Sequence, residues 1–153
     1  MEISNQKRAR NIKRFFILSG ILIVIVSQFL LWYKKNEAVI ITAILFGLYV
    51  VFILFANYNS IFFSSEGGKI TIRYYPVITI FRKEYNTIEF PHETLLNFQI
   101  EKGLGYSDLT IAIRTKRGIA EYPSISLAAL SKAEIEQIRA TLLEIMQKNR
   151  AGS

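Results

Sequence analysis

Two long apolar segments in the first third of the chain, residues 15–33 and 38–56, contain no charged side chain, and each holds 19 residues. A helix of that length rises about 28 Å, which is close to the hydrocarbon thickness of a bilayer, about 30 Å. Only residues 34–37 separate the two segments, so the second helix has to turn back beside the first. The sequence therefore predicts a transmembrane helical hairpin over residues 15–56.

The distribution of basic residues predicts the orientation of this hairpin. The first 14 residues hold five basic side chains and a single acid, Glu2, whereas the loop at residues 34–37 holds two lysines and Glu37. The positive-inside rule then places residues 1–14 in the cytoplasm as a basic arm, together with everything after residue 56. We expect a multi-pass plasma-membrane protein with both termini in the cytoplasm.

A cleaved secretion signal is the alternative interpretation, because a basic segment before an apolar stretch is typical of such signals. However, the apolar run is longer than a usual signal core, no small-x-small cleavage site follows it, and a second apolar segment comes at once. The chain contains no cysteine, which excludes disulfide bonds and thiolate metal sites and agrees with an intracellular domain.

The remaining chain, residues 60–150, is long enough for one small domain with a single core. The net charge of +7 divides into +4 in residues 1–14, +1 in the hairpin loop and +2 over residues 60–153. Because this part is nearly balanced in charge, we expect no nucleic-acid partner. The last three residues are left outside the predicted domain.

Alternation of apolar and polar side chains predicts antiparallel strands with one buried face in this domain. The clearest segments are residues 69–74, 97–101 and 108–114, and shorter ones lie at residues 77–82 and 87–90. Glycine-containing turns are expected at residues 66–68, 103–105 and 117–118. Pro76 and Pro91 cannot donate a ladder hydrogen bond, so we expect the sheet to end, bend or break there.

A C-terminal helix is predicted from residue 131 onward. Ser131 and Glu134 have the spacing of a capping box, in which each side chain accepts a hydrogen bond from the other residue's amide. The expected buried stripe consists of Ile135, Ile138, Leu142, Ile145 and Met146. This stripe predicts that the helix packs on the strands.

The order of two spans, six or seven short strands and one capped helix resembles a membrane-anchored bacterial pleckstrin-homology-like domain protein of the small two-span type. The residues that carry the resemblance are NTIEFPHETLLNFQI (86–100), TKRG (115–118) and YPSISLAALS (122–131). The resemblance covers residues 60–148 and implies the bacterial inner membrane. It also implies an α+β fold, a bent antiparallel sheet or barrel of about seven strands closed by the C-terminal helix.

Pleckstrin-homology-like domains elsewhere bind phosphoinositides, peptides or other proteins, so the resemblance leaves two functions open. The first is a non-enzymatic scaffold or adaptor that presents the domain to a protein partner at the cytoplasmic face. The alternative is a module that binds anionic lipid headgroups. Basic residues that could contact a headgroup or a partner are Arg73, Arg82, Lys83, Arg114, Lys116 and Arg117. A solvated polar face is the simpler reading of the same residues.

No catalytic, cofactor or metal site is predicted. The single histidine, His92, has no cysteine or second histidine to act with, so it is interpreted as a loop residue. Within the spans, small and amide side chains can allow close helix contact, either inside the hairpin or with another membrane subunit, including a second copy. The residues proposed for that contact are Gly20, Gln28, Ala43 and Gly47.

Overall fold

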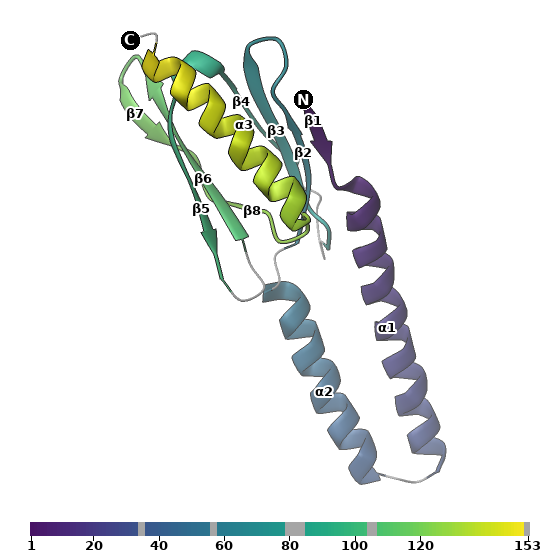
Figure 1. Cartoon of the computed structure of the whole chain (residues 1–153). Helices are drawn as coiled ribbons and strands as arrows, with labels where there is room; N and C mark the ends of the chain where they lie inside the picture. Colours follow the sequence, from purple (N-terminus) through teal and green to yellow (C-terminus); the bar gives the residue numbers. More distant parts are fainter. Residues whose placement is uncertain (34–35, 56–57, 79–84, 104–106, 152–153) are drawn as a thin grey trace.

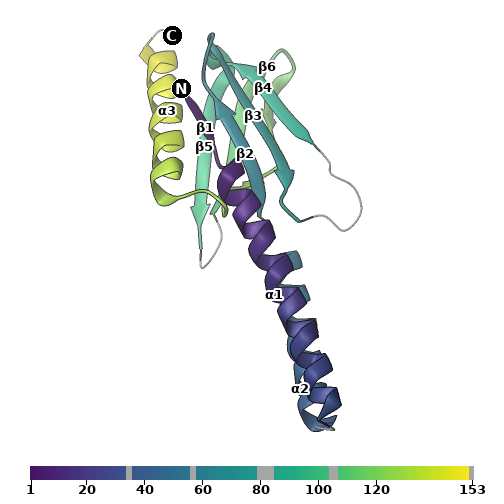
Figure 2. The same cartoon turned by 90° about the vertical axis from the view of Figure 1, so that its right-hand side faces the viewer.

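The computed structural model describes residues 1–33, 36–55, 58–78, 85–103 and 107–151. Two helices, α1 (Gln6–Trp32) and α2 (Asn36–Phe55), extend side by side from one end of a β-rich domain (Figure 1). The view turned by 90° shows them as one narrow stalk (Figure 2). A third helix, α3 (Lys132–Ala151), lies against the domain. Ala151, which lies outside the predicted domain at residues 60–150, is the last residue of this helix.

The N-terminal segment is not the separate basic arm that the sequence predicted. Glu2–Ser4 form a short strand, β1, which pairs antiparallel with β2 (Asn59–Ser64), so that Ile3 lies opposite Phe63. α1 begins at Gln6, well before the predicted start at residue 15, because lysine and arginine are good helix formers. Residues 1–14 therefore belong partly to the domain and partly to α1.

Of the helices in the described parts of the chain, only α1 is long and apolar enough to cross a membrane by length and composition. None of its most apolar 18-residue window is buried in the molecule. The described apolar part of α2, Glu37–Ile53, is shorter. The predicted first span is thus supported, whereas the second span and the orientation stay predictions.

The strands form two antiparallel four-stranded sheets. Sheet A has the order β1-β2-β3-β4, with β3 at Lys69–Pro76 and β4 at Asn86–Pro91. Sheet B contains β5 (Leu95–Lys102), β6 (Ser107–Thr115) and β7 (Gly118–Glu121), and β8 (Ile125–Ser126) also pairs with β6. Over the residues that the structure describes, the fold is therefore α+β as predicted, but it has eight strands, and the sheets do not close into a barrel.

Most of the predicted strands and turns are confirmed. The segments 69–74, 87–90, 97–101 and 108–114 lie within β3, β4, β5 and β6. Gly67 and Gly68 have φ of 62° and 74° in the β2–β3 turn, a conformation that suits glycine. The strand predicted at residues 77–82 is not formed at Val77 and Ile78, which lie in a bend, and its other residues are outside the described ranges, as are two residues of the turn at 103–105.

Pro76 and Pro91 stand at strand ends, as expected from their missing amide hydrogen. β3 ends at Pro76 and β4 ends at Pro91. After Pro91 a short 3₁₀ helix, η1 (His92–Thr94), leads directly into β5. The chain therefore passes from sheet A to sheet B at this corner.

One hydrophobic core joins the two sheets and α3. Fully buried side chains include Phe63 and Ile72 from sheet A, Leu109 and Ile111 from sheet B, and Ile138 from α3. In α3 the predicted stripe is confirmed, with Met146 only half-buried. The capping box is also present: the Ser131 amide donates to Glu134 Oε2 at 2.6 Å, and the Glu134 amide donates to Ser131 Oγ at 3.2 Å.

Candidate functional site

A groove of about 660 Å³ lies where the C-terminal end of α3 meets η1 and the start of β5. Its lining residues are Glu93, Thr94, Leu95, Leu96, Arg114, Met146, Lys148, Asn149 and Arg150. We call this the distal groove, because it lies at the end of the domain away from the α1–α2 turn (Figure 1). Its volume lies within the range of about 300–1,000 Å³ that is common for ligand sites.

Hydrogen bonds fix the elements that form the distal groove. The Asn149 side chain donates to the backbone oxygens of His92 and Leu95, at 2.7 and 3.1 Å. The Thr94 hydroxyl donates to the Pro91 oxygen at 2.8 Å. These bonds hold the last turn of α3 on the corner between the two sheets, so the groove has fixed walls.

The distal groove combines an apolar wall with a rim that carries basic side chains and one exposed acid, Glu93. Leu95 is buried, and Leu96 and Met146 are half-buried, whereas Arg114 and Arg150 are exposed. Lys148 donates to Glu144 at 2.7 Å, and this hydrogen bond and the lysine charge hold the pKa of Glu144 below its ordinary value. The two arginines are therefore the better candidates to receive an anionic group, and the apolar wall suits an adjacent apolar side chain.

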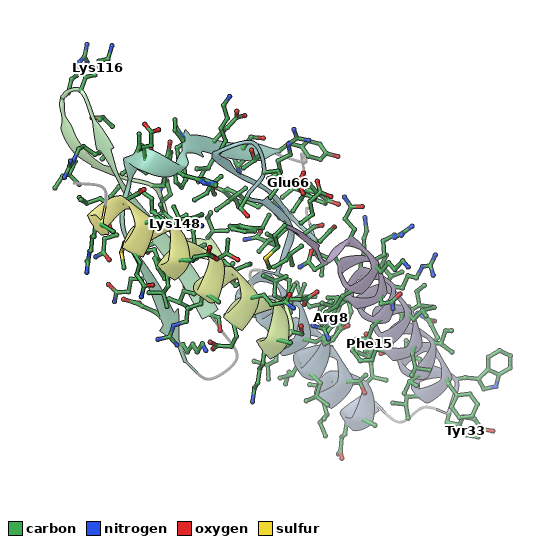
Figure 3. All side chains as sticks on the ribbon, turned by 45° about the horizontal axis from the view of Figure 1, so that its top comes forward. Arg8, Phe15, Tyr33, Glu66, Lys116 and Lys148 are labelled. Atoms are coloured by element: carbon green, nitrogen blue, oxygen red, sulfur yellow. The ribbon has the colours of Figure 1, made fainter. Side chains whose placement is uncertain are left out.

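Of the six basic residues singled out from the sequence, the four that the structure describes are divided between the two sheets. Arg73 lies in sheet A, with its guanidinium carbon 5.9 Å from the centre of the Phe62 ring. Arg114, Lys116 and Arg117 lie in sheet B at the β6–β7 hairpin, and only Arg114 lines the distal groove. Figure 3 shows Lys116 at the opposite end of the molecule from Tyr33. Arg82 and Lys83 are outside the described residues.

No protein-family model matches the chain, and comparison with curated proteins and with solved structures finds no match either. The resemblance to pleckstrin-homology-like domains therefore stays a prediction. The functional interpretation has to come from the geometry of the chain itself.

The residues proposed for close helix contact are not in tight contact in this structure. Gln28, Ala43 and Gly47 are exposed, and Gly20 is half-buried. A Cβ atom added to Gly20 or Gly47 would meet no atom within 4 Å, leaving out the helix's own nearby backbone. A contact of these residues with another membrane subunit stays a prediction.

The hydrogen bonds and the ring contact between side chains of α1 and α2, among the described residues, lie instead near the domain. The Tyr49 hydroxyl donates to the Phe16 backbone oxygen at 3.0 Å and also forms a hydrogen bond with the Ser19 hydroxyl. The Phe16 ring lies 6.1 Å from the ring of Tyr49 and 6.0 Å from that of Tyr58, centre to centre. A tyrosine inside an apolar segment was the sequence signal for this contact, because its hydroxyl needs a partner.

His92 lies in η1 and is half-buried. Its Nε2 atom is buried without a hydrogen-bond partner among the residues that the structure describes. Over the same residues, no group of three or more His, Asp or Glu side chains could hold a metal ion. The interpretation of His92 as a connecting residue agrees with its place between β4 and β5.

Proposed function

We propose that the chain is a two-span membrane protein whose helical hairpin holds a non-enzymatic scaffold or adaptor domain at the cytoplasmic face. The observation that carries this proposal is the distribution of exposed hydrophobic side chains. Among the described residues, the exposed large hydrophobic side chains lie between Phe15 and Phe52, with Met1, Tyr85 and Ile119 as exceptions. Such a continuous apolar surface needs an apolar environment, and a bilayer provides one.

The ends of the two helices also suit a bilayer. Trp32 and Tyr33, at the turn far from the domain, are 87% and 62% exposed, as expected for aromatic anchors at a membrane surface. The domain side of α1 carries the basic residues, which favours a cytoplasmic domain. β1 supplies Ile3 to the core, so a signal that is cleaved off would remove part of the domain.

A topology experiment tests this arrangement. A reporter enzyme that is active only outside the cytoplasm, fused after Arg150, is expected to be inactive. The matched control places the same reporter in the α1–α2 turn, after Tyr33, where activity is expected. Activity of the Arg150 fusion, or inactivity of the Tyr33 fusion, would contradict the two-span topology.

For the adaptor role, we propose that the distal groove binds an acidic segment of a protein partner. Support comes from Arg114 and Arg150 at its rim, from its apolar wall, and from its place away from the membrane. The rim carries Arg114 from β6 and Arg150 from the last turn of α3, and a guanidinium group can form two parallel hydrogen bonds with a carboxylate. The headgroup alternative on Arg73, Arg114, Lys116 and Arg117 is less favoured, because these residues are divided between two sheets.

Affinity capture from native membranes with the full chain as bait tests this role. A partner of the distal groove should be retained by the natural chain and largely lost with Arg114→Glu, since one rim charge is reversed. Lys132→Glu is the matched control, because Lys132 is exposed at the other end of α3. A protein set that is unchanged by Arg114→Glu would contradict the groove as the partner site.

A further inference from the structure

A second groove, of about 460 Å³, lies between α1 and α2 next to the domain. It is lined by Asn11, Ile12, Phe15, Phe16, Phe52 and Tyr58. We call it the interhelix groove. Its walls are mostly aromatic, and Phe15 and Phe52 are 65% and 58% exposed, so a ligand can reach their rings.

Basic side chains surround α1 directly on the domain side of the interhelix groove. This basic collar consists of Lys7, Arg8, Arg10, Lys13 and Arg14, all of which are exposed. Arg8 reaches Glu134 at 3.6 Å, and the other four make no ion pair with residues that the structure describes. The first turn of α1 contains no acidic residue. The collar therefore carries a concentrated positive charge that favours an anion.

The polar and apolar parts meet within one helical turn. Arg8 precedes Asn11 and Ile12 by one turn on the side of α1 that lines the groove, whereas Lys13 and Arg14 project to other sides of the helix. Figure 3 shows Arg8 and Phe15 along the part of α1 that adjoins the domain. A ligand that fills this place needs an anionic group next to a long apolar chain.

We propose that the interhelix groove and the basic collar bind one anionic phospholipid. Its acyl chain lies against Phe15 and Phe52, and its phosphate lies beside Arg8, with the rest of the collar adding to the positive potential. This inference rests on the proposed membrane anchoring, because the boundary between Arg14 and Phe15 then lies at the level of the headgroups. Charge complementarity favours a phospholipid with net negative charge over a zwitterionic one.

Native mass spectrometry of the full chain in detergent micelles tests the proposal. The probes are phosphatidylglycerol, phosphatidylcholine and inorganic phosphate, added at equal concentrations. We expect phosphatidylglycerol to bind more tightly than phosphatidylcholine. Arg8→Gln should weaken phosphatidylglycerol binding about fivefold, the effect of one basic residue near an anionic surface.

Two further variants separate the parts of the site. Phe52→Ala should weaken the binding of both lipids, because it removes part of the acyl-chain wall and no charge. Lys116→Gln removes the same charge at the distant hairpin and should change neither affinity. Arg8, Phe52 and Lys116 are all exposed, so the domain should stay folded in each variant.

Several results would overturn the proposal. These are equal binding of the two lipids, an equal effect of the distant control variant, or displacement of phosphatidylglycerol by inorganic phosphate. Alkaline washing of membranes distinguishes this failure from failure of the anchoring. If the chain stays in the membrane but shows no lipid preference, only the lipid site is wrong; if washing releases the chain, the anchoring and the lipid site are both wrong.

Discussion

Replacing Ile138 with alanine is expected to lower the free energy of unfolding by about 2–5 kcal/mol. Ile138 is 1% exposed and lies in the middle of the α3 stripe, inside the core that joins both sheets. Removing most of its side chain leaves a cavity that the surrounding strands cannot fill. Pulse proteolysis of the full chain in detergent micelles, over a series of urea concentrations, measures the change.

Two variants on the same helix give the scale for this measurement. Ser131→Ala removes the hydroxyl of the capping box and should cost about 0.5–2 kcal/mol. Gln137→Ala, at an exposed position next to Ile138, should change stability by less than about 0.5 kcal/mol. If Ile138→Ala behaves like Gln137→Ala, α3 is not packed on the sheets.

The second large effect is expected for Asn5→Ala, at about 2–6 kcal/mol. Asn5 is 2% exposed, and its side chain joins the start of α1 to β2. Its amide nitrogen donates to the Asn59 oxygen at 3.1 Å, and its side-chain oxygen accepts from the Ile61 amide at 2.7 Å. The substitution leaves two buried backbone groups without these partners, at about 1–3 kcal/mol each.

Ser4→Ala is the control for Asn5→Ala, because Ser4 is the exposed neighbour in β1. The same proteolysis experiment should show little change for Ser4→Ala. Equal stability of the two variants would mean that the N-terminal segment is not docked on sheet A. The isolated segment 60–150, which lacks β1 and Asn5, is expected to be less stable than the domain in the full chain.

Sequence patterns predicted the elements whose stabilisation is local. The capping box of Ser131 and Glu134, the α3 stripe and the alternating segments of β3, β5 and β6 all depend on residues close together in the chain. Pro91 likewise marked the end of β4, because proline lacks the amide hydrogen that a central strand requires.

Features that depend on distant partners were missed. β1 has only three residues and one apolar side chain, Ile3, so it carries no visible period. Its existence depends on β2, which follows both helices in the chain. The distal groove was predicted only in part. Arg114 was predicted as a contact residue from its charge, whereas Asn149 and Arg150 reach the groove only because α3 packs against η1.

The pairing of β1 with β2 has a consequence for biosynthesis. β1 leaves the ribosome first, but Ser4 pairs with Phe62, which follows α2. Sheet A can therefore be completed only after both helices have been synthesised. In the proposed topology, the two membrane crossings return β2 to the side where β1 lies, and a chain in which only one of the two helices crossed the membrane would leave the two strands on opposite sides. A folded domain would then show that both helices, or neither, cross the membrane.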